Sequence, residues 1–488
     1  MRQFVLLVIV GCVARVLALE LAAWRGETVS SWLPSGEVVG SAPDGLTVTV
    51  GVAREVAYAP QPHAETRHVV TDRVEWNSTA TGLRVVQVKV SAQAKPGIYS
   101  CGDVTVKVVD RVLPPASDWK YYLNLWQHPW AVARMARVAP FTKAHYDAMR
   151  PLWRMLAAAG QKSLTLTLVE QPWNHQCFDA YRPMVGYVRR ADGTTDVDWT
   201  IFDAYVEFGR SCGIGPNLDL FTMCPWGYKV SWLDETGELV RAEAKPGTSF
   251  FREYWRPLLK SLAAHLREKG WFDQTYISLD ERTPEDLRNT AEFIQEVAPG
   301  LRIAMAGNRK PSDYKGITVD AYSLGMRYIT PEFLSEASPR RAQGRITTFY
   351  ICCSPNTPNT FMSSELDEAF WVGAYPAMCG LDGLLRWAYN SWPKDACQDA
   401  TYSPSFSKGG WASGDTFLIY PDGSPSMRFL ALVDGIQQAE KFNILKAAGV
   451  RVDELAALAS RYSLKGALEK KPGDFGNLVQ ETRMILNK

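Results

Sequence analysis

The sequence predicts an α/β protein in which an N-terminal β-sandwich is followed by a (β/α)8 barrel of the TIM type and a helical C-terminal tail. Between residues 22 and 112, short β-rich runs alternate in polarity and are separated by turns that contain Pro and Gly. After Leu113-Pro114-Pro115, short apolar runs alternate with longer helical stretches, which is typical of a parallel sheet. Residues 447–488 are rich in Ala, Leu, Lys and Glu and predict helices.

The N-terminus has the shape of a signal peptide. A short basic start precedes an apolar run that is broken at Arg15, and residues 1–18 are expected to be removed by cleavage after Ala18. An exported protein, periplasmic or secreted, follows from this interpretation. A lipoprotein anchor at Cys12 is the lesser alternative. No later segment is long and apolar enough to predict a transmembrane helix.

Length and charge limit the classes of partner. At 488 residues the chain is longer than one core usually organises, and the predicted domains are a sandwich at 22–112, a barrel at 116–446 and a tail at 447–488. Lys and Arg number 53 against 52 Asp and Glu, so the net charge of +1 provides no field for gripping a nucleic acid. Neutral substrates are favoured, and the 17 Trp suit the faces of sugar rings as well as ordinary cores.

The barrel prediction assigns eight strands and the helices between them. The predicted strands are 121–125, 164–168, 217–221, 276–280, 302–305, 318–322, 346–351 and 383–388. The predicted helices are 142–160, 200–212, 250–269, 284–297 and 364–379, with a further strand at 415–420 and a helix at 426–446.

Two adjacent carboxylates end the fourth of these strands. Asp280 and Glu281 close an apolar run, and Thr283 with Pro284 then has the pattern of a helix start. In a parallel barrel the carboxyl ends of the strands form the catalytic face. The alternative is that the two acids only complement the dipole of the following helix.

Tryptophans also follow the ends of four predicted strands. Each one alone is typical of a packed corner, but their common placement on one face predicts a sugar-binding cleft. The tryptophans are Trp126, Trp130, Trp173, Trp226, Trp387 and Trp392.

Other chemistries lack their motifs. The six His stand in no H-E-x-x-H or H-x-H arrangement, and no G-x-S-x-G, P-loop or G-x-G-x-x-G sequence occurs, so neither a metal nor an organic cofactor is expected. Eight cysteines follow Cys12; they are expected to be free, and the adjacent Cys352 and Cys353 would be strained if they bridged each other.

The remaining carboxylate pair suggests glycoside hydrolysis, with a constraint on mechanism. Most glycosidases place two carboxylates on opposite sides of the scissile bond, about 5 Å apart or more, which neighbouring residues do not easily achieve. Asp280 and Glu281 can act on the same side if a 2-acetamido group of the substrate is the nucleophile. A 2-acetamido sugar is then the expected substrate.

Several strings between residues 115 and 446 resemble glycoside hydrolase family 123. They are Leu125-Trp126-Gln127-His128-Pro129-Trp130, the Asp280-Glu281 pair, Pro358-Asn359-Thr360-Phe361, Leu385-Arg386-Trp387-Ala388-Tyr389-Asn390-Ser391-Trp392, Gly414-Asp415-Thr416 and Gly435-Ile436-Gln437. The resemblance implies an exo-acting β-N-acetylgalactosaminidase that retains configuration through an oxazolinium intermediate. By the family pattern, Asp280 stabilises the acetamido group and Glu281 is the general acid and base.

Further residues are candidates for substrate binding, each beside a structural interpretation. Tyr322 contacts the acetamide or packs in the barrel, and Asn308 and Asn359 bind sugar or form turns. Arg386 binds sugar or makes a buried ion pair, and Asp415 binds hydroxyls or caps a turn. The other candidates are Trp126, Trp387 and Trp392 for stacking, and His128, Tyr389 and Asn390 within the strings that resemble the family.

Two alternatives to this function stay open. The first is a barrel of the same family that acts on another sugar, such as β-N-acetylglucosamine. The second is a noncatalytic glycan-binding protein, against which the intact Asp280 and Glu281 argue. In every case the expected partner is a glycan or glycoconjugate.

Overall fold

The computed structural model describes residues 19–33, 42–60, 64–401, 410–469 and 474–488, and it contains two compact units. The first unit holds the described residues up to Val52, together with Trp76–Val112 and Asn487. The second holds Ala53–Glu75, Leu113–Leu486 and Lys488, so the segment 53–75, within the predicted sandwich, groups with the barrel. The predicted signal peptide and Cys12 lie outside the described residues.

The strands of residues 19–112 form two sheets, and the core that they share is made of residues of the first unit. One sheet has the order β1-β7-β6 and the other β2-β5-β3-β4. Along β7 the side chains of Val104, Val106 and Val108 are buried while those between them are more exposed, and Val86 and Val88 of β5 join the same core. The strands are β1 (Leu19–Arg25), β2 (Thr28–Leu33), β3 (Leu46–Tyr58), β4 (His68–Trp76), β5 (Leu83–Val90), β6 (Gly97–Cys101) and β7 (Val104–Val112). The two predicted sheets are present, but the sandwich domain predicted at 22–112 does not coincide with the first unit, because residues 53–75 group with the barrel.

The second unit contains an eight-stranded parallel sheet in the order β8-β19-β18-β17-β16-β15-β12-β9. A parallel bridge between Leu123 and Gln161 brings the first and last strands of this order together, so the sheet approaches a closed barrel. The strands are β8 (Tyr122–Leu125), β9 (Ser163–Thr167), β12 (Asn217–Phe221), β15 (Thr275–Asp280), β16 (Arg302–Gly307), β17 (Ala321–Gly325), β18 (Ile346–Ile351) and β19 (Gly383–Arg386). All eight predicted strands are present, although β17 begins later than predicted.

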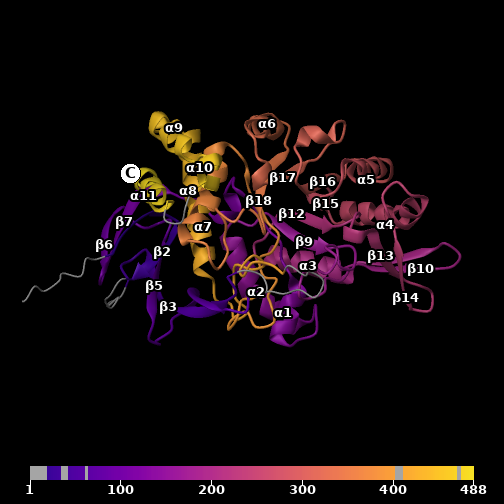
Figure 1. The fold of residues 1–488 in the computed structure, drawn as a ribbon, viewed down its shortest axis with the longest axis horizontal. Coiled ribbons are helices and arrows are strands. Elements are labelled where there is room, and N and C mark those ends of the chain that lie inside the picture. Colours follow the sequence, from indigo (N-terminus) through magenta and orange to yellow (C-terminus); the bar gives the residue numbers. More distant parts are fainter. Residues whose placement is uncertain (1–18, 34–41, 61–63, 402–409, 470–473) are drawn as a thin grey trace, which may run out of the picture. The chain divides into compact units, whose positions relative to one another are not determined.

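Helices follow the strands, as the βα pattern requires. Figure 1 shows α4, α5 and α6 along the strands β15 to β17. Several helices begin at a hydroxyl cap, including α5, where Thr283 Oγ1 accepts a bond from the amide of Asp286. The barrel helices are α1 (Pro129–Ala136), α2 (Lys143–Ala158), α3 (Thr200–Ser211), α4 (Ser249–Glu268), α5 (Pro284–Val297), α6 (Pro331–Ala342), α7 (Leu366–Cys379) and α8 (Met427–Ala447). The predicted helical tail comprises α9 (Val452–Arg461), α10 (Leu464–Glu469) and α11 (Gly476–Leu486).

The structure corrects two details of the prediction. Among the described residues, 415–420 do not form the predicted strand. Phe417 and Ile419 make only isolated bridges, to Asn390 and Pro425. A further sheet with the order β11-β10-β13-β14 was not predicted. Its strands β10 (Gly186–Arg189), β11 (Thr195–Asp198), β13 (Lys229–Leu233) and β14 (Leu239–Glu243) are short and partly exposed, which weakens their hydrophobic pattern.

A buried ion pair fixes the segment 53–75 within the second unit. Asp72 and Arg428 are each 2 % exposed, and their side chains meet at 3.1 Å. Tyr420 donates to the same carboxylate at 2.6 Å, and Arg428 also donates to the carbonyl of Thr360 at 2.7 Å. Each charge therefore has a partner, which a buried ion needs.

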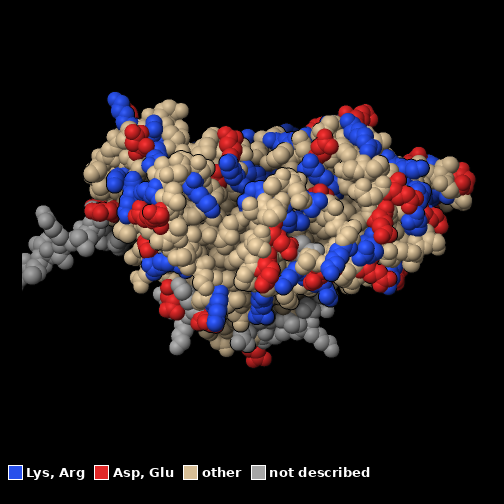
Figure 2. Space-filling model, turned by 90° about the horizontal axis from the view of Figure 1, so that it is seen from above, with Lys and Arg blue, Asp and Glu red and all other residues tan. Residues whose placement is uncertain are grey.

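The surface carries both signs of charge. Figure 2 shows basic and acidic side chains interspersed over the face that it displays, in keeping with the net charge of +1. Over the described ranges, no helix has both the length and the apolar character needed to cross a membrane.

Candidate active site

The adjacent carboxylates lie where the sequence predicts them, at the carboxyl end of β15. Asp280 is the last residue of the strand and Glu281 follows it, with its amide donating to the carbonyl of Ala306 at 2.7 Å. Glu281 has a φ of 49°, in the left-handed region that few non-glycine residues adopt. The capped start of α5 at Thr283 and the bond to Ala306 hold it there.

Each carboxyl group accepts a hydrogen bond from a different part of the barrel. The indole Nε1 of Trp226 donates to Oδ2 of Asp280 at 3.1 Å, and the hydroxyl of Tyr350 donates to Oε1 of Glu281 at 2.5 Å. Arg282 donates through Nε to the carbonyl of Asp280 at 2.8 Å and lies 5.2 Å over the ring of Trp226. The pair is therefore oriented from both sides.

Burial dominates the electrostatics of Asp280. Desolvation, followed by the charge of Glu281, raises the pKa of Asp280 to about 7, while Arg282 and the Trp226 bond oppose the shift. Burial and the charge of Glu281 likewise raise the pKa of Tyr350 far above its usual range, so the phenol stays protonated and donates. The site thus holds one carboxyl group whose pKa lies near 7, beside a second carboxyl group that accepts a hydrogen bond from a phenol.

Tyr350 was not among the predicted site residues, although its position in the strand indicates a side chain that faces the barrel interior. It is the second-last residue of β18, on the face that Ile346 and Thr348 turn to the barrel interior. Gly325 on the neighbouring strand makes room for it, because a Cβ at Gly325 would meet the Tyr350 hydroxyl oxygen at 3.0 Å. Strand parity at the carboxyl end would have selected Tyr350 as inward-facing.

Two predicted residues of the first loop pack inside the protein. Trp126 is 2 % exposed and stacks on Trp173 with ring centroids 5.1 Å apart. His128 has no exposed surface and stacks on Tyr181 at 3.7 Å. Burial lowers the pKa of His128 to about 3, so it is neutral and does not serve as an acid at neutral pH.

A buried ion pair lies at the end of β19. Arg386 and Asp415 have no exposed surface and meet at 3.1 Å, as one of the two interpretations of Arg386 anticipates. Half-buried Trp387 donates through Nε1 to Oδ1 of Asp415 at 3.2 Å and lies edge-on to half-buried Trp411 at 5.4 Å. Trp387 is therefore the predicted stacking residue that keeps surface for a ligand.

Four more predicted residues have no exposed surface and bond to backbone: Asn359, Tyr389, Asn390 and Trp392. The amide of Asn359 donates to the carbonyls of Cys352 and Pro355, and that of Asn390 bonds to the backbone of His128 in both directions. These side chains fix the loops around the carboxylates, and the structure leaves them no surface for a sugar.

Tyr322 and Asn308 follow neighbouring strands but differ in exposure. Tyr322 has no exposed surface, and its ring lies 6.1 Å from Tyr314 and 6.3 Å from Phe333 of α6, so it packs between sheet and helix. Asn308 directly follows β16 and is half-buried, with surface open to solvent.

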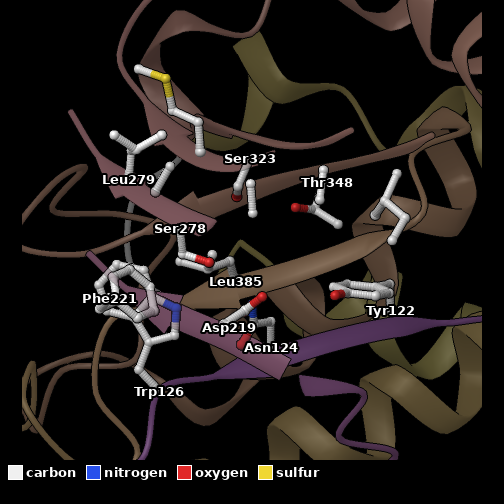
Figure 3. A pocket seen from close by; sticks show the side chains of 15 residues that line it. Tyr122, Asn124, Trp126, Asp219, Phe221, Ser278, Leu279, Ser323, Thr348 and Leu385 are labelled. Carbon is white, nitrogen blue, oxygen red and sulfur yellow. The ribbon is translucent and has the colours of Figure 1, made fainter. Parts of the chain in front are cut away.

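Below the carboxylates, several polar side chains stand among the apolar residues of the barrel interior. Figure 3 shows Asn124 and Asp219 close together, with Ser278, Ser323 and Thr348 facing the same space. Asn124 donates to Asp219 at 2.7 Å, and burial raises the pKa of Asp219 to about 6. The cavity they line measures about 20 Å³, room for one water molecule.

The described residues include no group of three or more His, Cys, Asp or Glu side chains that could hold a metal ion. The chemistry that this chain itself supplies at the site is that of two carboxyl groups, a phenol and indole rings.

Comparison with known proteins bears on the fold and the family. The model of the family "Glycoside hydrolase 123, catalytic domain" matches residues 126–445, more than half of the 488 residues. A solved family 123 glycoside hydrolase from Clostridium perfringens, described in terms of glycolipid glycan hydrolysis, shares 21% identity over 96% of this chain and 92% of its own, with a TM-score of 0.79. A GH39 enzyme from Xanthomonas axonopodis pv. citri reaches only 0.38 at 13% identity, over 68% of each chain. No curated protein matches the chain.

Proposed function

The chain belongs to glycoside hydrolase family 123, and from that premise we propose that it is an exo-acting enzyme that releases terminal β-linked N-acetylgalactosamine with retention of configuration. The observation that carries the proposal is the adjacency of Asp280 and Glu281 at one strand end, each held by its own donor. Two neighbouring carboxyls serve one side of a sugar ring better than opposite sides.

The proposed mechanism uses the acetamido group of the substrate as the nucleophile. Its carbonyl oxygen attacks the anomeric carbon while Glu281 gives a proton to the leaving oxygen, which breaks the glycosidic bond. Asp280, as a carboxylate, accepts the acetamide N–H and stabilises the positive charge of the oxazolinium. Glu281 then takes a proton from the water that opens the ring, so the second attack restores the original configuration.

The donors to the two carboxyls are positioning residues in this scheme. Tyr350 fixes Oε1 of Glu281 and leaves the other oxygen for the leaving group, and Trp226 fixes Oδ2 of Asp280 in the same way. Trp387 and Asn308, which are half-buried near the strand ends, are the proposed sugar contacts.

The natural substrate is proposed to be a glycoconjugate. The similar enzyme from Clostridium perfringens is described as hydrolysing a glycolipid glycan, which makes glycolipid oligosaccharides the first class to test. Export remains part of the proposal, on the signal-peptide shape of residues 1–18. N-terminal sequencing of the mature protein would test it, with Leu19 expected as the first residue and a lipid-bearing Cys12 as the contrary result.

The direct test compares three aryl glycosides: β-N-acetylgalactosaminide, β-N-acetylglucosaminide and β-galactoside. We expect turnover of the first alone, and its near-abolition in Glu281→Gln and Asp280→Asn. Cleavage of the galactoside would contradict acetamide participation, and preference for the glucosaminide would correct the sugar. Binding without hydrolysis of any of the three would favour a noncatalytic glycan-binding protein.

A further inference from the structure

Two thiols stand at the rim of the active site and have no part in the proposed reaction. Cys352 and Cys353 directly follow β18, two and three residues beyond Tyr350, which bonds to Glu281. The described cysteines are all free, and among them Cys353 alone is exposed. The pair is therefore accessible from solvent at the strand end that carries a catalytic contact.

The sulfurs of this pair are spaced for a bridge of one atom. Their Sγ atoms lie 3.8 Å apart, far beyond the 2.05 Å or so of a disulfide bond. Two sulfurs bound at about 2.3 Å to one atom lie roughly 3.3 to 3.8 Å apart as the angle at that atom opens from about 90° to the tetrahedral value, so a small closure of the pair suits a pyramidal centre. The observed separation thus matches capture by a single thiophilic atom better than direct oxidation.

The loop that holds the thiols is rigidly anchored. Buried Asn359 donates to the carbonyl of Cys352 at 2.9 Å and to that of Pro355 at 2.6 Å, and buried Arg386 donates to the carbonyl of Ile351 at 3.3 Å. Both sulfurs are therefore presented together before any ligand arrives, which lowers the entropic cost of capture.

The two thiols differ in pKa, and the charges that affect them include the carboxylates of the site. The hydrogen bond from the Cys352 thiol lowers the pKa of Cys353, while the charges of Asp415 and Glu281 act in the opposite direction. The pKa of Cys352 is raised by its bond to Cys353 and by burial. Cys353 is also the more exposed of the two thiols, so it is the sulfur that attacks first.

We propose that Cys352 and Cys353 form a covalent capture site for thiophilic electrophiles that bridge two sulfurs through one atom, of which trivalent arsenicals are the model class. An organoarsenic oxide, R–As=O, forms two As–S bonds with the pair. The two thiol protons leave with the oxide oxygen as one water molecule, and no electron is transferred. The adduct then stands beside Tyr350 and Glu281 and obstructs hydrolysis.

The test treats the full chain with one equivalent of phenylarsine oxide and measures the intact mass. We expect one phenylarsine group per chain in the wild type, removed by 2,3-dimercaptopropanol. Cys352→Ser and Cys353→Ser should hold no adduct that survives a monothiol wash, whereas Cys397→Ser, which removes a half-buried thiol elsewhere, should behave as the wild type. An equal adduct in either of the two rim variants, or none in the wild type, would overturn the proposal.

A second arm measures turnover and rests on the proposed function. With the glycoside that the untreated enzyme cleaves, modification should lower activity about 10²-fold or more, the low end of what general acid–base catalysis contributes. Full modification with unchanged turnover would refute the placement beside Glu281. If the untreated enzyme cleaves none of the glycosides, the proposed function fails, and the mass measurement still decides the capture site.

Discussion

The hydroxyl of Tyr350 on β18 donates to Oε1 of Glu281 at the end of β15 across 2.5 Å. Two strands separate β18 from β15 in the sheet order, so this bond spans the barrel mouth instead of joining neighbours. It ties the orientation of the proposed acid and base to a residue far away in the sequence.

Tyr350→Phe should lower kcat with little change in KM. The bond goes to a carboxylate, and such bonds contribute about 1.5–3 kcal/mol, or roughly a tenfold to hundredfold loss. The matched control is Tyr389→Phe, whose hydroxyl donates to the carbonyl of Leu152 inside the protein. It should lower the melting temperature and leave kcat nearly intact; equal loss of kcat in both variants would contradict the positioning role of Tyr350.

The pH profile of kcat/KM should show an acid limb near pH 7. Burial and Glu281 raise the pKa of Asp280 to about 7 in the free enzyme, and only its ionised form stabilises an oxazolinium, so activity rises as the pH passes through that value. Trp226→Phe removes a bond that lowers the pKa of Asp280, and the limb should move to higher pH. Trp173→Phe is the control, because Trp173 packs on Trp126. A limb that stays in place or moves down in Trp226→Phe would refute this assignment.

The free energy of unfolding should decrease as the pH rises from about 4 to about 6, because of Asp219. Burial raises its pKa from 3.8 to about 6, so over this range the folded state binds more protons than the unfolded state, and the free energy of unfolding decreases as pH rises. About two pKa units correspond to at most about 3 kcal/mol. Asp219→Asn should make this dependence shallower in urea unfolding at pH 4 and pH 6, although the raised pKa of Asp280 gives a decline of the same sign in both proteins. A parallel decline in both proteins would exclude Asp219 as the cause.

Asp72→Ala should destabilise the protein by about 3–5 kcal/mol, because it leaves Arg428 as an uncompensated buried charge. Urea unfolding would measure the loss, with Asp110→Ala as the control. Asp110 pairs with Arg25 at the surface and is mostly exposed, so its removal should cost under about 1 kcal/mol. Asp72→Ala/Arg428→Met should recover part of the stability; no recovery would contradict the buried-charge explanation.

The fold could be predicted from the sequence because the barrel strands are buried on both faces and bounded by turn residues. Strand 217–221 matches its prediction, as does 346–351. The strand prediction at 415–420 was wrong because these residues are apolar for a different reason. They are buried next to the ion pair of Asp415 with Arg386, and they make only isolated bridges. The sheet of β10, β11, β13 and β14 was not predicted, because its exposed strands carry polar residues.

The candidate site divides in the same way. Asp280 and Glu281 are local: a strand end and a helix cap in one short string place them. The residues that contact the substrate could not be identified from short strings, because a polar residue in the sequence can be buried or exposed in the fold. Asn359 and Asn390 are polar yet bury their amides on backbone, while Tyr350 required knowledge of strand parity and of the small Gly325 beside it.

The backbone at Glu281 has a consequence for selection on this protein. A non-glycine residue in the left-handed region costs of order 1 kcal/mol, which glycine at the same place would relieve. A screen that rewards only thermal tolerance would therefore favour replacement of the residue on which hydrolysis is proposed to depend. Ancestral or consensus redesign of this enzyme should hold position 281 fixed, because resistance to heat and turnover place opposite demands on it.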